Sequence, residues 1–338
     1  MPAVRACGLL VTHTIVFAGP IAAEVAKVPW ASVVLAPMVF LSGFDPPVLP
    51  PAPWLRHARG WLGPWFWRAL LSAGKARVRR WTRPVGDFRK ECGLEPRHAP
   101  LFEDAYAGDL VLAMFDPIFG APQPDWPGNV AQTGFVFLDD TQDASGIDPA
   151  LNAFLDAGEP PVVFTLGSSA VNDAGRFYEV SLQVTKDLGR RAVLLIGEDP
   201  RNVPEGPLPP GVATAPYAPF SELFPRAAAV VHQGGVGTTA QGLRAGVPAL
   251  VVPWAHDQHD NADRVTRLGM GATVSRHSYN PAVVGRALRS ILDDPACAAR
   301  AAEVGRKIRA HDGVAAACDA LADVLRHRDR RADGLVRA

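Results

Sequence analysis

Apolar and polar positions alternate along the second half of the chain in blocks that have the lengths of strands and helices. Short apolar runs rich in β-branched residues predict strands over 162–166, 192–196, 212–215, 229–232, 247–253 and 272–275. Amphipathic segments predict helices over 174–188, 221–226, 281–292, 295–310 and 313–327. This alternation predicts a doubly wound, mostly parallel sheet, in which ligands bind at the carboxyl ends of the strands.

The first half contains fewer predicted strands and ends in a polar linker. Its apolar runs predict strands over 9–12, 31–36, 110–115 and 130–137. Segment 139–160 is rich in Asp, Gly and Pro, which is typical of a linker. We therefore expect an α/β protein with a first domain over 1–138, a linker over 139–160, a second domain over 161–328 and a tail over 329–338.

The strand that ends at His232 runs directly into a glycine-rich turn, QGGVG at 233–237. Thr238 and Thr239 suit the start of the helix that follows. Free amides at a glycine-lined helix start, together with the positive end of the helix dipole, form an anion site, and phosphate is the usual anion. At the end of its strand, His232 is placed to donate to the same phosphate. The alternative is an ordinary α/β turn with a core histidine.

An acid–amide pair follows the next strand on the same edge of the predicted sheet. Asp257 and Gln258 come after 247–253, and we expect them in a loop. A carboxylate beside an amide can hold several sugar hydroxyls at once. Together with the phosphate site, this pair predicts a site for a sugar joined to a diphosphate.

This block resembles the donor-binding signature of the family 1 nucleotide-sugar glycosyltransferases, in the bacterial branch with macrolide, sterol and rhamnolipid enzymes. The residues that match its pattern are His232, Gly235, Gly237, Thr238, Gly246, Pro248, Asp257, Gln258, Asn261 and Ala262. Gln241 stands where many members carry a Glu that binds ribose, so the nucleotide preference stays open. The resemblance implies a GT-B fold of two Rossmann-like domains, and sugar transfer with inversion.

Two further segments follow predicted strands of the second domain. Ser168 and Ser169 come after 162–166, where their hydroxyls could reach a diphosphate, although a helix cap is the alternative. Tyr217 and Ala218 follow 212–215. The resemblance places the nucleotide base against this segment, whereas Tyr217 and the nearby Phe220 could also be ordinary core aromatics.

The first domain is similar only to the middle of the acceptor domain of the same family. The motif LVTH at 10–13, a helix and a strand ending in VLAP match that region. In the family, the catalytic histidine lies in the loop after the first strand of the domain. We therefore expect an incomplete first domain that begins after several usual elements. His13 is then the candidate base, and a structural histidine is the alternative.

Segment 54–90 combines tryptophan with positive charge. It contains Trp54, Trp61, Trp65, Trp67 and Trp81. Ten Lys or Arg residues accompany them, with Asp87 as the acid. Such helices suit peripheral contact with an anionic membrane, or an apolar acceptor pocket with a basic rim. Two ordinary packing helices with a solvated charged face are the alternative.

Composition excludes several other functions. The chain of 338 residues has 34 basic and 34 acidic residues, so its formal net charge is zero, which argues against binding nucleic acid. The 4 cysteines lie far apart and no apolar run has the length of a membrane span, so we expect a cytoplasmic protein. The acidic pair Asp139-Asp140 lies in the polar linker, so we expect no metal.

These observations predict a glycosyltransferase that moves a sugar from a UDP- or dTDP-sugar to a hydroxyl of a small hydrophobic acceptor. No other cofactor is expected. His232, Gly235, Gly237 and Thr238 would stabilise the leaving diphosphate, and Asp257 with Gln258 would orient the sugar. The alternatives are a nucleotide-sugar 2-epimerase and a donor-binding remnant without catalytic activity.

Overall fold

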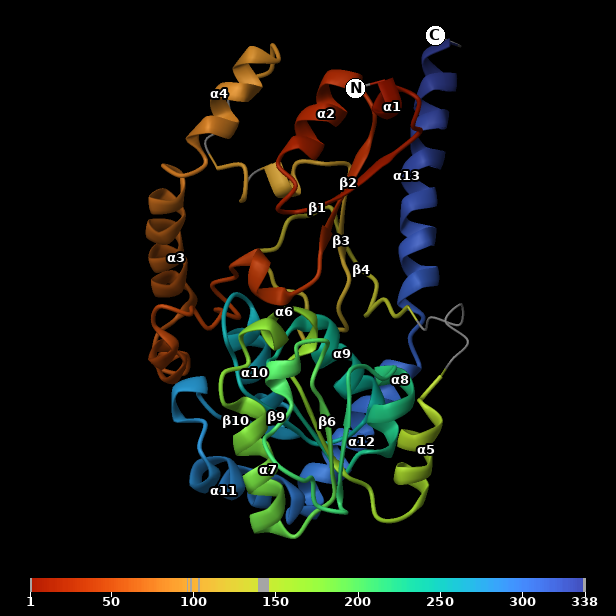
Figure 1. Ribbon diagram of the computed structural model, residues 1–338. Coiled ribbons are helices and arrows are strands. Elements are labelled where there is room, and N and C mark those ends of the chain that lie inside the picture. Colours follow the sequence, from red (N-terminus) through yellow and green to blue (C-terminus); the bar gives the residue numbers. More distant parts are fainter. Residues whose placement is uncertain (1, 96, 98, 103, 139–145, 337–338) are drawn as a thin grey trace. The chain divides into compact units, whose positions relative to one another are not determined.

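The computed structural model describes residues 2–95, 97, 99–102, 104–138 and 146–336 (Figure 1). The chain forms two compact units, one of residues 1–47, 54–136 and 312–338 and one of 48–53 and 137–311. The last helix therefore belongs to the first unit, whereas the sequence assigned 313–327 to the second domain. Segment 48–53 belongs to the second unit, where the Val48 N–H donates to Asp260 Oδ1 at 2.9 Å.

The first unit is built on a parallel sheet of four strands in the order β1-β2-β3-β4. The strands are β1 (Leu10–His13), β2 (Trp30–Val34), β3 (Leu110–Ala113) and β4 (Val130–Gln132). All four were predicted, although β4 ends five residues before the predicted end at 137, and its last bond to β3 runs from the Thr133 N–H to the Ala113 carbonyl at 3.0 Å. β3 is buried along its whole length, as its apolar sequence requires.

A helix was expected between LVTH at 10–13 and the following strand, and α2 occupies that position, whereas α1 was not predicted. The helices of the first unit are α1 (Pro2–Arg5), α2 (Ala18–Ala26), α3 (Pro64–Val78), α4 (Arg83–Glu91) and α13 (Gly313–Val336), with short 3₁₀ turns at Pro37–Phe40, Pro53–Ala58 and Asp104–Tyr106. Ala317 of α13 is buried with Ala31, Leu110 and Leu112 of the sheet. This apolar contact explains why the last helix clusters with the first unit.

A buried ion cluster fixes α4 to α2. Arg89 is 1% exposed and its guanidinium donates to both carboxylate oxygens of Glu24, at 3.2 and 2.7 Å. Arg97 lies 3.1 Å from Glu24 and 2.8 Å from Asp104. Two cations therefore share two carboxylates, which compensates for the cost of removing Arg89 from water.

The second unit contains a six-stranded parallel sheet in the order β10-β9-β8-β5-β6-β7. Its strands are β5 (Val162–Thr165), β6 (Ala192–Leu195), β7 (Val212–Ala215), β8 (Ala229–His232), β9 (Ala249–Val251) and β10 (Gly271–Thr273). The predicted parallel sheet and all six of its strands are confirmed. The chain order reverses between β5 and β8, which is where open α/β sheets bind ligands.

Eight α-helices in the described part of the second unit precede, connect or follow these strands. They are α5 (Pro149–Asp156), α6 (Gly167–Ala170), α7 (Phe177–Leu188), α8 (Phe220–Leu223), α9 (Val236–Ala245), α10 (Gln258–Arg267), α11 (Pro281–Leu292) and α12 (Pro295–Arg309), with 3₁₀ turns at Val171–Asp173, Pro200–Asn202, Phe224–Arg226 and Arg276–Ser278. Helix α5, whose start is capped by Asp148, lies within the predicted linker. The expectation that Gln258 lies in a loop was wrong, because Gln258 is the first residue of α10.

Both faces of the second sheet are covered. Phe164 belongs to a cluster with Leu194 and Val231 on one face, and Val163 belongs to a cluster with Val193 and Val230 on the other. Successive strand residues point to opposite faces, so this pattern requires helices on each side. Polar residues are thereby confined to the strand ends, where the candidate site lies.

Replacing Arg89 tests the ion cluster. We expect Arg89→Met to destabilise the first unit by about 3 kcal/mol, because Glu24 loses a buried partner while Arg97 remains. Chemical denaturation monitored by circular dichroism measures this. Arg77→Met, which removes an exposed charge from α3, is the matched control. Equal stability of the two variants would show that the cluster does not stabilise this unit.

Candidate functional site

The glycine turn after β8 takes the form that an anion site requires. Gly234 has a φ of 88°, and a Cβ there would lie 2.8 Å from Val251 and 3.1 Å from the Gln258 carbonyl oxygen. Gly235 is the N-cap residue of α9 and supplies no side-chain cap. The first amides of α9 are therefore available to a ligand, and the positive end of the helix dipole lies behind them.

His232 is a buried, neutral hydrogen-bonding group at the end of β8. It is 1% exposed, and its Nδ1 accepts the Gly234 N–H at 3.0 Å. Burial lowers the pKa of His232 to about 4. With Nδ1 accepting, the neutral ring carries its proton on Nε2, so Nε2 is the atom that can donate to a phosphate oxygen.

The start of α10 is tied to the glycine turn. Asn261 donates from Nδ2 to the Gly234 carbonyl at 2.9 Å and to Asp257 Oδ2 at 2.8 Å. Burial raises the pKa of Asp257, and the hydrogen bond from Asn261 opposes that shift. Gln258 Oε1 accepts the amides of Trp254 at 2.7 Å and Ala255 at 2.9 Å. Gln258 thus uses its oxygen on the loop before α10, and its Nε2 is the atom left for a sugar hydroxyl.

The turn after β5 packs directly on the turn after β8. Gly167 has a φ of 63°, and a Cβ there would lie 2.3 Å from Gln233 Nε2 and 3.3 Å from Thr238 Oγ1. The Gly167 N–H donates to Thr165 Oγ1 at 3.2 Å. Only glycine fits this close approach at position 167. The turn brings the hydroxyl of Ser168 to the edge of the sheet where α9 begins. Ser169 is helical, and its side chain lies outside the described residues.

A cavity of about 590 Å³ opens at this edge of the sheet. Five predicted residues line it, namely Ser168, Tyr217, Gly237, Thr238 and Gln241. Among the described residues, six other predicted ones lie outside this lining: Ala218, His232, Gly235, Thr239, Asp257 and Gln258. Ala218, His232 and Thr239 are buried around it. Of the five residues expected to gather at the carboxyl edge, Ser168, Tyr217 and Thr238 line this cavity, whereas His232, the last residue of β8, and Gln258 lie outside its lining.

Tyr217 and Phe220 differ in their environments. Tyr217 is 68% exposed although it lines the cavity, so its ring is available to a flat ligand. Phe220 stacks on Phe224 with ring centroids 4.5 Å apart, so it packs in the protein as well as lining the cavity. Phe220 is thus partly a core residue, whereas Tyr217 is not packed in the core.

Sequence reasoning missed several lining residues at the ends of β5, β6 and β7. They are Thr165, Val171, Asn172, Leu195, Gly197, Glu198 and Pro216. Their positions follow from the rule that ligands meet the carboxyl ends of parallel strands, applied to every strand instead of to the motifs alone. Glu198 adds an exposed carboxylate to the lining.

The remaining candidates lie elsewhere. His13 ends β1 in the first unit, is half-buried, and its Nδ1 accepts the Ile15 N–H at 3.4 Å. Asp139 and Asp140 lie outside the described residues. Within the described ranges, no group of three or more His, Cys, Asp or Glu side chains is arranged to hold a metal ion.

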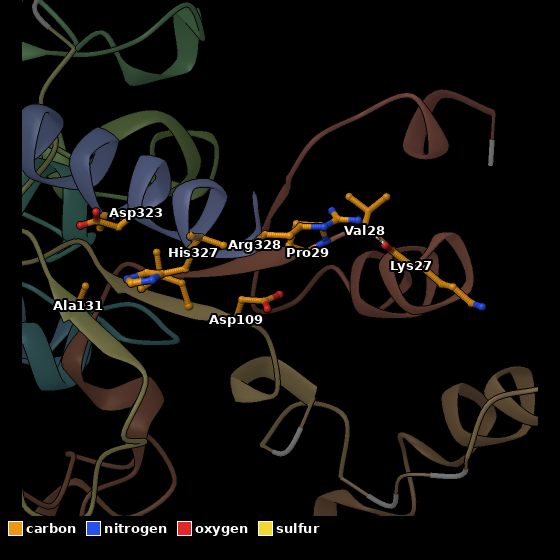
Figure 2. Close-up of a pocket in the computed structure, with 11 residues that line it drawn as sticks. Lys27, Val28, Pro29, Asp109, Ala131, Asp323, His327 and Arg328 are labelled. Carbon is orange, nitrogen blue, oxygen red and sulfur yellow. Dashed lines mark hydrogen bonds between the residues drawn. The ribbon is translucent and has the colours of Figure 1, made fainter. Parts of the chain in front are cut away.

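A cavity of about 790 Å³ in the first unit has a different character (Figure 2). Lys27 and Pro29 precede β2, Asp109 precedes β3, and His327 and Arg328 come from α13. The cavity thus lies at the amino ends of parallel strands, opposite to the edge where such sheets bind ligands. Its lining has mixed charge, and Asp109 already accepts the Trp30 N–H at 3.0 Å. We do not assign the donor site to it.

Comparison with known proteins points to sugar transfer. Residues 183–319 match the family described as erythromycin biosynthesis protein CIII-like, C-terminal domain. The O-mycaminosyltylonolide 6-deoxyallosyltransferase of Streptomyces fradiae is 37% identical over 243 residues, which cover 70% of this chain and 56% of that protein. A sterol 3-beta-glucosyltransferase of Emericella nidulans is 31% identical over 266 residues, 76% of this chain and 18% of that enzyme. The chain thus spans about half the length of the first relative.

Solved structures share the fold. CalG4, the calicheamicin glycosyltransferase, has a TM-score of 0.68 at 22% identity, covering 94% of this chain and 73% of that chain. The glycosyltransferase VinC in complex with dTDP has a TM-score of 0.63 at 19% identity, covering 96% of this chain and 75% of that chain. At this identity the likeness establishes the fold, which is GT-B as the sequence predicted.

The burial of His232 predicts how stability depends on pH. An unfolded histidine binds a proton near its ordinary pKa of 6.5, whereas His232 in the folded protein has a pKa of about 4. Between these values the unfolded state holds more protons, so stability falls as the pH drops from 6.5 toward 4, by at most about 1.4 kcal/mol per pH unit.

Chemical denaturation across this pH range measures the slope. His232→Asn keeps an acceptor for the Gly234 amide but does not titrate, so we expect a shallower slope for this variant than for the wild type. His277→Asn, at an exposed position, is the control and should keep the wild-type slope. Identical slopes for all three proteins would show that His232 does not cause the pH dependence of stability.

Proposed function

Because the chain belongs to the family 1 nucleotide-sugar glycosyltransferases, we propose that it transfers a sugar from a nucleoside diphosphate to a hydroxyl of a small hydrophobic acceptor. The second unit binds the donor in this proposal. The observation that carries it is the convergence of an uncapped helix start, a neutral buried histidine and a cavity of about 590 Å³ on one edge of the sheet.

The diphosphate is assigned to the start of α9. Amides at Gly235 and Gly237 and the Thr238 hydroxyl supply neutral donors, and His232 Nε2 adds another. Negative charge grows on the diphosphate as its bond to the sugar breaks. Donors that are already in position stabilise this charge without reorganising, and that lowers the barrier to in-line displacement with inversion.

The nucleoside is assigned to the outer part of the same cavity. The exposed Tyr217 ring offers a stacking surface for the base. Gln241 lies in α9 and lines the cavity, so its amide can bond a ribose hydroxyl either as a donor or as an acceptor. Uridine and thymidine diphosphate sugars are the proposed donors, and VinC provides a fold relative crystallised with dTDP.

The sugar is assigned to Asp257 and Gln258. With Oδ2 of Asp257 held by Asn261 and Oε1 of Gln258 held by backbone amides, each residue keeps one fixed group for the ligand. That group is an acceptor on Asp257 and a donor on Gln258. The two groups together can distinguish the orientation of neighbouring hydroxyls, and holding the sugar in one orientation favours attack at its anomeric carbon.

The relatives described above are glycosyltransferases by their names, which favours transfer over the 2-epimerase alternative. The relatives act on a macrolide and on sterols by their names, and we extend to this chain only the shared class, a hydrophobic acceptor with a free hydroxyl. We propose a cytoplasmic enzyme that uses no metal and no cofactor besides the donor. His13 is the proposed general base.

Donor binding is tested by two substitutions at His232. His232→Asn removes the Nε2 donor while keeping an acceptor for Gly234, so we expect affinity for uridine or thymidine diphosphate to fall by about 1–3 kcal/mol. His232→Gln places an amide nitrogen near the Nε2 position and should recover part of that loss. Calorimetric titration measures both, with His277→Asn as control. Unchanged affinity in the Asn variant would make His232 a purely structural residue.

Transfer is tested with residues 1–338, radiolabelled nucleotide sugars and a panel of sterol, lipid and macrolide acceptors. If His13 is the base, His13→Ala should lower turnover about a hundred- to ten-thousandfold and leave nucleotide affinity unchanged. His57→Ala, at an exposed position in the same unit, is the control. Turnover that survives in His13→Ala would exclude His13. Nucleotide binding without any product would favour the donor-binding remnant.

A further inference from the structure

Segment 54–90 presents large aromatic side chains to solvent. Trp61 is 90% exposed, Trp65 is 83% exposed and Trp81 is 75% exposed. Trp54 is also exposed. A tryptophan that only packs a helix is largely buried, as Trp67 is at 3% with its Nε1 donating to the Leu62 carbonyl. Ordinary packing therefore explains Trp67 and leaves the four exposed rings without a role.

The helix α3 separates these two kinds of residue by face. Trp67 and Leu71 are buried, one helical turn apart. Trp65 and Arg68 are exposed on another face, where the Arg68 guanidinium lies 5.6 Å from the centre of the Trp65 ring. One face of α3 is therefore buried. The other face is exposed to solvent and combines an indole with a cation. α4 follows it directly in the chain (Figure 1).

A basic cavity lies where α3 passes into α4. Its volume is about 420 Å³, and its lining consists of Arg79, Arg80, Thr82, Arg83, Gly86, Asp87, Lys90 and Arg97. The lining thus has five cationic side chains and one carboxylate, with Lys90 3.7 Å from Asp87 and Arg97 held by Glu24 and Asp104. The first turn of α4 also contributes to this lining, and Thr82, at its N-cap, makes no side-chain cap. The cavity attracts an anion through side-chain charge and through the helix dipole.

The charge of this segment differs from that of the whole chain. Segment 54–90 contains ten of the 34 basic residues and one of the 34 acidic residues, although the chain as a whole has no formal net charge. A positive region on a neutral protein points to a local partner of negative charge. The indoles beside it favour a partner that also has an apolar zone.

We propose that segment 54–90 docks onto a bilayer that carries anionic phospholipids. A lipid phosphate occupies the cavity near Arg80, Arg83 and Lys90, and Trp61 and Trp65 enter the zone between headgroups and acyl chains. Indole rings favour this zone because one part of the ring is apolar and its N–H remains hydrated. The docking that we propose is peripheral, through side chains of segment 54–90. None of the described helices has the length and apolar composition of a membrane span.

Vesicle sedimentation with the full chain tests the proposal and needs no variant for its first measurement. We expect binding to vesicles of phosphatidylcholine mixed with phosphatidylglycerol, much weaker binding to phosphatidylcholine alone, and loss of binding at high salt. Equal binding to both vesicles would overturn the electrostatic part of the proposal. Absence of binding to the anionic vesicles at low salt would overturn all of it.

Two variants locate the surface. Arg80→Gln/Arg83→Gln/Lys90→Gln should reduce partitioning on the order of a hundredfold, since each basic residue near an anionic surface contributes about a fivefold factor. Arg286→Gln/Arg289→Gln/Arg306→Gln removes the same charge from exposed positions of the second unit. It should bind as the wild type does. Equal loss in both triple variants would show that net charge alone drives binding.

The tryptophans are tested separately with Trp61→Ser/Trp65→Ser. Brominated acyl chains should quench the fluorescence of the wild type on anionic vesicles, and this quenching should largely disappear in the variant. Quenching that stays unchanged would show that these rings do not enter the bilayer. An anionic oligonucleotide that binds as tightly as the vesicles, with the same dependence on segment 54–90, would assign the surface to polyanions in general and overturn the lipid assignment. Nucleotide titration of each variant verifies that the second unit is folded.

Discussion

Burial of the second sheet on both faces is the constraint on which the rest of this unit depends. A strand such as β5 has Val163 in one apolar cluster and Phe164 in the other, so neither position can hold a polar side chain. Polar chemistry is consequently restricted to the last residue of each strand and to the residues that follow it. Thr165 and His232 end β5 and β8, and Tyr217 comes two residues after β7. The reversal of strand order between β5 and β8 brings the ends of these strands to one edge.

The same close packing explains the glycines of the motif. Gly234 and Gly167 have positive φ values, and each approaches a neighbouring element too closely for a Cβ. Gly246 ends α9 with a φ of 73° and also meets α12, where a Cβ on Gly305 would lie 2.6 Å from the Gly246 Cα. The pattern therefore encodes packing of the turn against its neighbours as well as access for a ligand. Both demands fall on the same few residues, which makes the motif easy to recognise in a sequence.

The sequence predicted the strands well because a buried parallel strand has a continuous apolar run, as β5, β6, β8 and β9 do, while the edge strands β7 and β10 are partly exposed and less apolar. Helix α10 was missed because its sequence, QHDNADRVTR, is mostly polar. Its buried polar residues are satisfied by contacts that span long sequence distances, such as Val48 with Asp260 and Asn261 with Gly234. The position of α13 in the first unit likewise depends on a tertiary contact, between Ala317 and β3. Local patterns contain no information on such partners.

The hydrogen bonds of the site also limit what each residue can contribute, which the sequence could not show. His232, Asp257 and Gln258 each carry two polar atoms, and in each residue one of these atoms is held by the protein. The atom that remains has a single role: a donor on His232, an acceptor on Asp257 and a donor on Gln258. A motif specifies residue types, and the fold assigns one of two possible roles to each atom. The folded second unit therefore fixes which atoms donate and which accept, and the sequence alone does not. The proposed reaction depends on this, because the sugar must be oriented and the charge that develops at the diphosphate must be stabilised.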